Sequence, residues 1–303
     1  MKKFLTILLT TILAAGAFTG CGNVEYAEAG GSIITPKELR GLIGKDGVAI
    51  VDMQDEGGYA AQHVEGAVNI AVSSILSNMP VENSLAPRGR VQTLMSEAGI
   101  DNDTLIIIYD DGGSRDASRL WWTLLVYGHE NTKVVSGGFP AIEREGIGLT
   151  SKVPVITQKE FEVTDRRDDF VATMKDVLNQ VDDPDPDIIL LDVRTDAEYQ
   201  EAGKVPGSVM YDYSRNFYRD GMFLDVRATR INYLEAGIRP ENEIITYCRT
   251  AMRSSCTFLS LYNAGYRNIK MYDGAYLEWS ASGQNPVELP DGAKVSTSGR
   301  DFS

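Results

Sequence analysis

The sequence predicts an α/β protein built as two similar halves, each a parallel sheet flanked by helices. Two observations predict this class. A set of short motifs occurs twice along the chain in the same order. Short apolar runs also alternate with segments of helical spacing, a pattern typical of βαβ units with a parallel sheet covered on both faces. The length of 303 residues suits two domains.

Residues 1–20 have the features of an export signal. Lys2 and Lys3 precede the apolar run 4–18, which is shorter than the ~20 residues of a membrane-spanning helix. A small residue, Gly20, directly precedes Cys21, which resembles a bacterial lipoprotein signal whose cleavage exposes the Cys for lipidation. Residues 21–31 are small and acidic, as in a flexible tether. We predict export and a lipid anchor at Cys21 on the outer face of the cell membrane. A plain secretory signal, with a periplasmic protein, is the alternative.

The first half contains two clear buried strands. The apolar run Val48–Val51 ends at Asp52, and Tyr59 follows seven residues later. The run Leu105–Tyr109 comes after the triplet Ala98-Gly99-Ile100. Short apolar runs bounded by turn residues are typical of buried strands. Helical spacing is present in 90–98 and 115–127, and Gly137-Gly138 marks a later turn.

The second half repeats this order. Ile188–Leu191 ends at Asp192, and Tyr199 again follows seven residues later. The triplet Ala236-Gly237-Ile238 precedes a strand that ends at Tyr247, and 254–262 has helical spacing. Asp273-Gly274 occupies the place of Gly137-Gly138. The halves are separated by the polar and charged residues 151–169.

Composition makes several function classes improbable. The formal charge of −14 disfavours nucleic-acid binding, because an acidic surface repels phosphates. Three cysteines and two histidines are too few for a disulfide scaffold or a His-based metal site. We therefore expect no metal, no cofactor and no nucleic acid, and contact with a membrane only through the lipid anchor.

The loops after Tyr109 and Tyr247 differ in chemistry. Ligands of parallel sheets lie at the carboxyl ends of the strands, so these loops are the places to look. Cys248 opens the second loop, and Asp110 stands at the matching position of the first. A cysteine between a strand and a helix N-terminus, with Arg249 and Arg253 nearby, favours the anionic sulfur. We therefore predict a nucleophile in the second half only.

The chain resembles a tandem-domain rhodanese, a thiosulfate sulfurtransferase. The motifs that carry the resemblance are Asp192-Val-Arg194-x-x-x-Glu198-Tyr199, Pro206-Gly207-Ser208 and the Cys248–Arg253 loop. In the first half they are Asp52 to Tyr59, His63 to Ala67, and Tyr109 to Trp122. The resemblance implies an inactive domain at 32–150, a linker at 151–169, a catalytic domain at 170–290 and a tail at 291–303.

The resemblance also implies a mechanism. Cys248 would attack the outer sulfur of thiosulfate, release sulfite and hold a persulfide, which cyanide or a thiol would then accept. The backbone of residues 249–253 would hold the persulfide, and Arg249 and Arg253 would orient the anion. The implied substrate-binding residues are, in chain order, Arg115, Arg194, Arg249, Thr250, Ala251, Met252 and Arg253.

Alternative activities remain open at this point. Related mercaptopyruvate enzymes carry a small residue after the Cys, so Arg249 favours thiosulfate as donor. Many members of the family have Gly at the place of Ala251, a departure that supports a non-enzymatic persulfide carrier or redox sensor as the rival. Thiosulfate enzymes often have Lys at the place of Thr250, so one cationic contact is absent here. Related phosphatases use Cys-x5-Arg, and the Cys-x4-Arg spacing of Cys248 and Arg253 disfavours them.

Other residues have structural interpretations. We expect Cys256 to be a packed core thiol, Asp192 to bind the loops at its strand end, and Arg194 to pair with Glu198 four residues on. His63 is expected to support a turn. Trp121 and Trp122 would pack in the core and against the other domain. A final set, Tyr213, Arg215 and Tyr218, could line an interdomain cleft or belong to a solvated loop.

Overall fold

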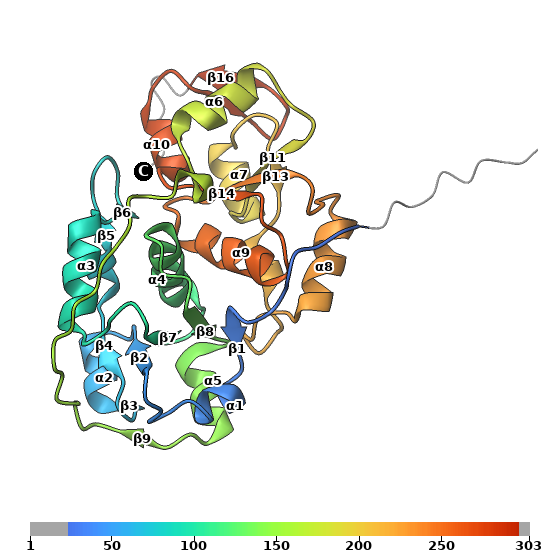
Figure 1. Ribbon diagram of the computed structural model, residues 1–303. Coiled ribbons are helices and arrows are strands. Elements are labelled where there is room, and N and C mark those ends of the chain that lie inside the picture. Colours follow the sequence, from blue (N-terminus) through green and yellow to red (C-terminus); the bar gives the residue numbers. More distant parts are fainter. Residues whose placement is uncertain (1–23, 297–303) are drawn as a thin grey trace, which may run out of the picture.

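A computed structural model of the protein describes residues 24–296 and confirms the α/β class. Two similar units lie side by side, the first coloured blue to green and the second yellow to red (Figure 1). Each contains a five-stranded sheet whose neighbouring strands are parallel. The predicted signal peptide and Cys21 lie outside the described residues.

The first unit has the sheet order β1-β8-β7-β2-β4, with β3–β9 and β5–β6 as separate antiparallel pairs. Its strands are β1 (Ile33–Ile34), β2 (Val48–Asp52), β3 (His63–Val64), β4 (Val68–Asn69), β5 (Leu76–Ser77), β6 (Ser84–Leu85), β7 (Leu105–Tyr109), β8 (Thr132–Val135) and β9 (Leu149–Thr150). Its helices are α1 (Pro36–Arg40), α2 (Glu56–Ala61), η1 (Val72–Ile75), α3 (Arg88–Glu97), α4 (Arg115–Val126) and α5 (Gly138–Glu145).

The second unit has the equivalent order β10-β14-β13-β11-β12 and ends in the antiparallel pair β15–β16. Its strands are β10 (Val171–Ala172), β11 (Ile188–Asp192), β12 (Val209–Met210), β13 (Glu243–Tyr247), β14 (Ile269–Tyr272), β15 (Pro286–Glu288) and β16 (Lys294–Ser296). Its helices are η2 (Asp168–Phe170), α6 (Met174–Asp182), α7 (Asp196–Ala202), η3 (Tyr213–Asn216), α8 (Val226–Glu235), α9 (Met252–Asn263) and α10 (Ala275–Ala281).

The central strands are apolar throughout because both faces of each sheet are covered. In β7, Ile106 and Ile108 belong to the core beneath α3 and α4, whereas Ile107 and Tyr109 belong to the core beneath α1 and α5. Alternate side chains of a strand point to opposite faces, so a doubly covered strand is apolar at every position.

The two units correspond closely around the loops that contain Asp110 and Cys248, and these loops differ in length. Helices α4 and α9 each have 12 residues. Residues 110–114 separate β7 from α4, and residues 248–251 separate β13 from α9, so the first loop is one residue longer. In the following turn, Ser136 after β8 corresponds to Asp273 after β14, and the predicted Gly137-Gly138 pair therefore corresponds to Gly274-Ala275.

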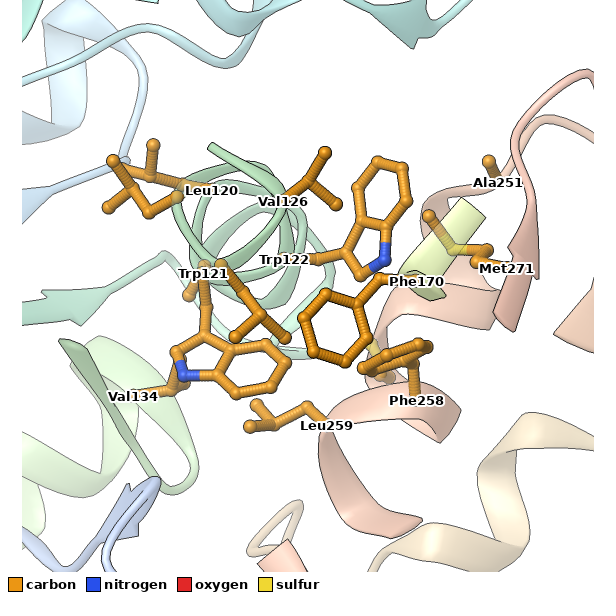
Figure 2. Close-up of a cluster of buried hydrophobic side chains, with 14 of the residues drawn as sticks. Leu120, Trp121, Trp122, Val126, Val134, Phe170, Ala251, Phe258, Leu259 and Met271 are labelled. Atoms are coloured by element: carbon orange, nitrogen blue, oxygen red, sulfur yellow. The ribbon is translucent and has the colours of Figure 1, made fainter. Parts of the chain in front are cut away.

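The units share one hydrophobic core. Helices α4 and α9 lie against each other, and the buried residues around them form a single cluster that spans both units. Trp122 of α4, Phe170 of η2 and Phe258 of α9 meet at its centre (Figure 2). The predicted packing of Trp122 in the core and against the other unit is confirmed, and Trp121, 5.3 Å from the ring of Tyr262, behaves in the same way.

The segment before β1 differs from a flexible tether. Residues 26–32, here called the N-terminal strap, cross the second unit before β1 begins the first (Figure 1). The backbone N–H groups of Ala27 and Gly30 donate to the carbonyls of Gly265 and Asn263 at 3.1 and 2.7 Å. The guanidinium of Arg230 lies 3.9 Å from the ring of Tyr26. These contacts fix the strap to the end of α9 and to α8.

The predicted linker and tail also make ordered contacts. Residues 151–167 contain no helix or strand, but the backbone N–H groups of Lys159 and Thr164 donate to the first unit, to the carbonyls of Ser96 and Tyr127. The tail expected from residue 291 begins within the β15–β16 hairpin. Among residues 24–296, no helix is long and apolar enough to cross a membrane.

Candidate active site

The Cys248 loop joins the end of β13 to the start of α9. Cys248 is 1% exposed. Ala251 caps the helix in the left-handed conformation, with φ of 62°. The first backbone N–H groups of an α-helix have no intrahelical acceptor and form a site that favours anions. The sulfur therefore stands at the electropositive end of α9, as the sequence predicts.

Hydrogen bonds hold both the sulfur and the backbone of this loop. The Ser254 hydroxyl lies 3.7 Å from Cys248 Sγ and 3.0 Å from the Ala251 carbonyl oxygen, so it can donate to either. At the start of α10, the Tyr276 N–H donates to the Cys248 carbonyl at 2.9 Å, and the Leu277 N–H donates to the Arg249 carbonyl at 3.1 Å. The position of Cys248 therefore depends on α10 as well as on α9.

Arg253 forms a bidentate ion pair with Glu198. Its Nη1 and Nη2 donate to Glu198 Oε2 and Oε1 at 2.6 and 2.7 Å. Burial lowers the pKa of Arg253, but the hydrogen bonds and the negative charge of Glu198 outweigh burial and raise it. Burial raises the pKa of Glu198, but hydrogen bonds from Arg253 and Thr195 lower it to about 2. Both groups are thus charged at neutral pH, and Glu198 neutralises much of the cation predicted to orient the substrate.

The remaining loop residues lie on the solvent side or at the helix start. Arg249 is exposed, Thr250 is half-buried, and Met252 is the first, half-buried residue of α9. Arg115, the first residue of α4, is exposed and contributes charge near Cys256. Arg249 thus follows Cys248 directly in the loop with an exposed side chain, and Arg115 lies at the adjoining end of the first unit.

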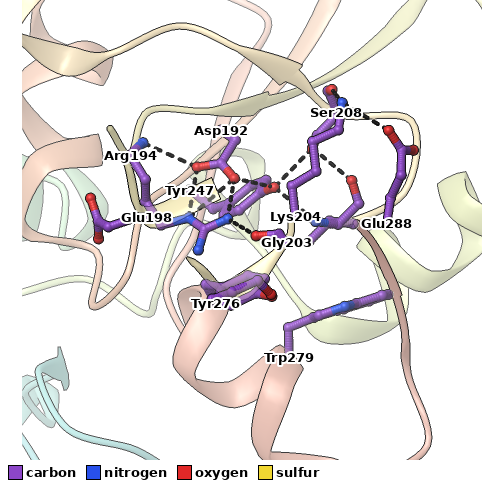
Figure 3. A network of polar contacts seen from close by, with 12 residues as sticks. Asp192, Arg194, Glu198, Gly203, Lys204, Ser208, Tyr247, Tyr276, Trp279 and Glu288 are labelled. Atoms are coloured by element: carbon purple, nitrogen blue, oxygen red, sulfur yellow. Dashed lines mark hydrogen bonds and ion pairs between the residues drawn. The ribbon is translucent and has the colours of Figure 1, made fainter. Parts of the chain in front are cut away.

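Arg194 is held by partners inside the second unit (Figure 3). Its guanidinium donates to the carboxylate of Asp192 and to the Gly203 carbonyl at 2.7 Å, and stacks 3.7 Å from the ring of Tyr276. The side chain is 2% exposed. The predicted pairing of Arg194 with Glu198 is wrong, because Asp192 is the partner at 2.6 Å and Glu198 binds Arg253. We accordingly revise its expected substrate contact to a role in holding the fold.

Asp192 acts as predicted, as the polar partner at the end of its strand. Its carboxylate accepts from the hydroxyl of Tyr247 at 2.8 Å and from the backbone N–H of Arg194 at 3.0 Å. Asp52 has the same position at the end of β2, and it likewise accepts from the hydroxyl of Tyr109. His63 is buried and stacked on Tyr59 at 4.0 Å, which confirms its structural role.

In the first unit, Asp110 occupies the place that Cys248 has in the second. Asp110 is 1% exposed. Its side-chain oxygens accept the backbone N–H groups of Gly112, Ser114 and Ala117 at 3.0, 3.3 and 3.3 Å. Burial raises the pKa of Asp110, and these hydrogen bonds oppose the shift. The backbone N–H groups of the first loop are therefore bound to the side chain of Asp110.

Cys256 is a packed thiol at the interface. Its sulfur donates to the carbonyl of Ser114 in the first unit at 3.4 Å, and burial raises the pKa of this thiol. Both observations agree with the predicted structural role. The structure describes Cys248 and Cys256 as free cysteines.

The residues predicted to line a cleft divide into two groups. Tyr213 lies 5.8 Å from the guanidinium of Arg253, close to the site. Arg215 stacks at 4.2 Å on Tyr211, and the hydroxyl of Tyr218 donates to Asp225 at 2.9 Å. The last two side chains therefore support the second unit itself.

A comparison with protein families assigns this architecture. The model of the rhodanese-like domain matches residues 35–145 and again residues 173–282. The chain belongs to the rhodanese family. The two matches correspond to the two units of the structure, so Cys248 lies in the second rhodanese-like domain and Asp110 in the first.

Individual relatives of this rhodanese have related descriptions. A thiosulfate sulfurtransferase of Pseudomonas aeruginosa is 29% identical over 266 residues, which cover 85% of this chain and 97% of the relative. A sulfur carrier protein of Thermus thermophilus is 29% identical over 73% of this chain and 83% of the relative.

Solved structures agree on the fold. The crystal structure of a 3-mercaptopyruvate sulfotransferase from Escherichia coli superposes with a TM-score of 0.70 at 22% identity, over 80% of this chain and 98% of that one. An anaerobic ergothioneine biosynthesis enzyme from Chlorobium limicola reaches a TM-score of 0.77 at 19% identity, over 85% of this chain and 70% of that one.

Two features of this rhodanese site are missed by sequence reasoning. The Glu198–Arg253 pair joins residues far apart in the chain, and the only local signal was the capping box in which Glu198 binds Thr195. The contact of α10 with the Cys248 loop is made by backbone groups, which leave no trace in residue type. Among residues 24–296, no cluster of His, Cys, Asp or Glu could hold a metal ion.

Proposed function

We propose that the protein is a sulfurtransferase that moves the outer sulfur of thiosulfate to cyanide or a thiol through a persulfide on Cys248. The observation that carries this proposal is the contrast between two matching loops. In the first domain the loop holds a carboxyl side chain with three backbone N–H groups. In the second domain the corresponding position is a sulfur with the same helix end behind it.

The first loop indicates which groups would bind the persulfide. By the correspondence of α4 with α9, Ser114 matches Ala251 and Ala117 matches Ser254. We infer that the backbone N–H groups of Ala251 and Ser254 take the role that Ser114 and Ala117 have toward Asp110. Charge-assisted hydrogen bonds of this kind are about twice as strong as neutral ones.

The transfer balances without a general base. The thiolate of Cys248 attacks the outer sulfur of thiosulfate, the S–S bond of thiosulfate breaks, and sulfite leaves with the bonding electron pair. The terminal sulfur of the resulting persulfide is then attacked by cyanide or a thiolate, and the Cys248 thiolate leaves. Arg249 is the exposed cation next to the nucleophile and would attract the anionic donor.

Two alternatives remain as competing activities. A persulfide carrier is favoured by the 1% exposure of Cys248 and by the likeness to a sulfur carrier protein. A 3-mercaptopyruvate donor is favoured only by the likeness of fold, and the charged Arg249 supports thiosulfate instead.

Thiocyanate formation from thiosulfate and cyanide tests the proposal. We expect turnover by the purified protein under reducing conditions, complete loss in Cys248→Ser, and activity in the matched control Cys256→Ser once its folding is confirmed. Turnover with 3-mercaptopyruvate but not thiosulfate would replace the donor. A single stoichiometric persulfide without turnover would establish the carrier instead.

We further propose export and lipidation at Cys21. The support is the sequence pattern of residues 1–21. Labelling of producing cells with a radioactive fatty acid should mark the protein, and Cys21→Ala should abolish the label. A labelled Cys21→Ala variant would contradict this assignment.

A further inference from the structure

The turn between β14 and α10 holds the backbone of the Cys248 loop and is itself hydrogen-bonded to the first domain. Asp273 is the first residue after β14, and α10 begins two residues later. The backbone N–H groups of Tyr276 and Leu277 then hold the carbonyls of Cys248 and Arg249. Any shift of Asp273 would therefore move the backbone that positions the sulfur.

Both carboxylate oxygens of Asp273 accept hydrogen bonds from the first domain. Arg119 Nη2 donates to Oδ1 at 2.7 Å, and the backbone N–H of Leu85 donates to Oδ2 at 2.7 Å. The same Arg119 Nη2 donates to the Asn83 carbonyl at 2.8 Å. Arg119 thus connects the β5–β6 arm of the first domain to the turn under Cys248.

The ion pair of Arg119 and Asp273 is largely buried. The side chain of Arg119 is 0% exposed and that of Asp273 is 16% exposed. Within the described part of the chain, Nε and Nη1 of Arg119 have no hydrogen-bond partner. A buried charge with unsatisfied donors is a poor way to gain stability, and burial of such a pair is better explained by the position it fixes.

The first domain provides an internal comparison. The Phe139 N–H donates to the Asp110 carbonyl at 2.7 Å, as Tyr276 does to Cys248. There the position of Asp273 is occupied by Ser136, whose hydroxyl accepts the backbone N–H of Phe223 from the second domain at 2.8 Å. Each domain thus donates hydrogen bonds to the turn of the other domain. Of the two turns, only the one next to the Cys248 loop is bound through an ion pair, that of Arg119 with Asp273.

We propose that Arg119 is a positioning residue for Cys248 that acts through Asp273, so that the domain without a nucleophile is required for the alignment of the other domain's site. This inference deepens the proposed function and rests on it only for the turnover measurement. The reactivity of the Cys248 sulfur provides a second measurement that needs no assumption about the donor.

The test uses the full chain with Arg119→Met, Asp273→Asn and the double variant. We expect kcat for thiosulfate and the rate of Cys248 alkylation by iodoacetamide each to fall about tenfold in both single variants, with KM changed less than twofold. Both rates of the double variant should be no lower than those of either single variant, because all three variants remove the same Arg119–Asp273 ion pair. The matched control Ser136→Ala removes the corresponding contact beneath Asp110 and should leave both rates within twofold.

The outcomes separate the possible failures. Arg119→Lys, which keeps the charge, should recover part of the lost rate and provides the test if Arg119→Met does not fold. Folded Arg119 and Asp273 variants with unchanged kcat and alkylation rate would overturn the inference. Absence of turnover in the unaltered protein would instead count against the proposed function, while the alkylation rates would still decide the role of Arg119.

Discussion

Among single residues, carboxylates determine which arginines near Cys248 can act on an anion. Asp192 neutralises Arg194 in the interior, and Glu198 neutralises Arg253 beside the sulfur. Arg249 alone of the three side chains is exposed. The positive field at the site is therefore weaker than three arginines in the motifs suggest, and the helix end contributes a larger share of it.

Removing the charge of Glu198 should strengthen the binding of the donor. In Glu198→Gln the guanidinium of Arg253 keeps its charge but loses its ionic partner, and we expect KM for thiosulfate to fall about fivefold, the equivalent of about 1 kcal/mol. The matched control is Glu201→Gln, an exposed residue of the same helix. A KM that rises or stays constant would show that the pair itself orients the substrate.

The ion pair of Glu198 with Arg253 stabilises the fold over a defined pH range. The pKa of Glu198 is lowered to about 2 in the folded protein, below its value in an unfolded chain. Its stabilising contribution is thus complete above about pH 4.5 and is lost as the pH falls toward 2. The effect of Glu198→Gln on KM should accordingly be constant between pH 5 and pH 8, in a series of steady-state measurements.

Asp116 should have the opposite effect on stability. Burial, together with the charges of Asp110 and Asp111, raises the pKa of Asp116 to about 6. The folded state then holds a proton that the unfolded state has released, so stability falls as the pH rises from about 4 to about 6. We expect Asp116→Asn to gain on the order of 1 kcal/mol in urea unfolding at pH 7.5 and much less at pH 4. Asp103→Asn is the exposed control, and equal gains at both pH values would contradict the assignment.

For single residues, prediction from the sequence succeeds where only one residue type can carry out the chemistry. Cys248 against Asp110 is such a case, because only one of the two can be a sulfur nucleophile. It fails for Arg194, whose spacing from Glu198 fits a helical pair but which lies before α7 begins at Asp196. The guanidinium therefore turns back to Asp192, a contact decided by the strand end and not by helical periodicity.

At the level of elements, the Cys248 loop accommodates a side chain where a glycine is common in the family. Ala251 adopts φ of 62° and is 0% exposed, with its methyl group in the main hydrophobic cluster. The left-handed conformation costs roughly 1–2 kcal/mol for an L-residue, and burial of a methyl group returns about 0.8 kcal/mol. The net cost of the alanine is therefore at most about 1 kcal/mol.

Ala251→Gly should therefore change little. We expect the free energy of unfolding to stay within about 1 kcal/mol of that of the unaltered protein, and kcat to stay within twofold. Urea unfolding and thiocyanate formation measure the two quantities. A large gain in kcat would indicate that the alanine methyl group does disturb the loop.

Strands and helices are predictable because each has its own signal. The all-apolar run of β7 and the helical spacing of α4 lead to bounds of Leu105–Tyr109 and Arg115–Val126, within one residue of expectation. The correspondence of Gly137-Gly138 with Asp273-Gly274 is out by one residue, because it matches the two turns by dipeptide, whereas the ends of β8 and β14 align Ser136 with Asp273. Only the backbone gives that alignment.

Across the whole molecule, the two domains behave as one packed body. A single cluster of buried residues includes Trp122 and Phe258 from the facing helices. Leu85 of the first domain binds the turn at Asp273, and Phe223 of the second domain binds the turn at Ser136. Interfaces with a continuous apolar core resemble the interior of a domain more than a transient contact. Separation of the domains would expose that core.

The protein should consequently unfold in one transition. We expect far-UV and near-UV circular dichroism to give coincident curves in urea. Phe258→Ala, at a fully buried site of the interface, should shift the single transition by about 3–5 kcal/mol without dividing it, whereas Val155→Ala, at a 99% exposed site, should not shift it. Two resolved transitions would mean that the domains are independent.

The N-terminal strap would also determine the orientation of the protein on a membrane if Cys21 is lipidated as proposed. The strap is bound at the end of α9 that carries Asn263 and Gly265, while the Cys248 loop lies at the other end, about 18 Å away along a helix of 12 residues. A chain fastened at Cys21 has only five residues to Tyr26, a reach of at most about 18 Å. Such a molecule would be held with the far end of α9 toward the support and its reactive sulfur turned to the surrounding solution, where soluble donors and acceptors arrive.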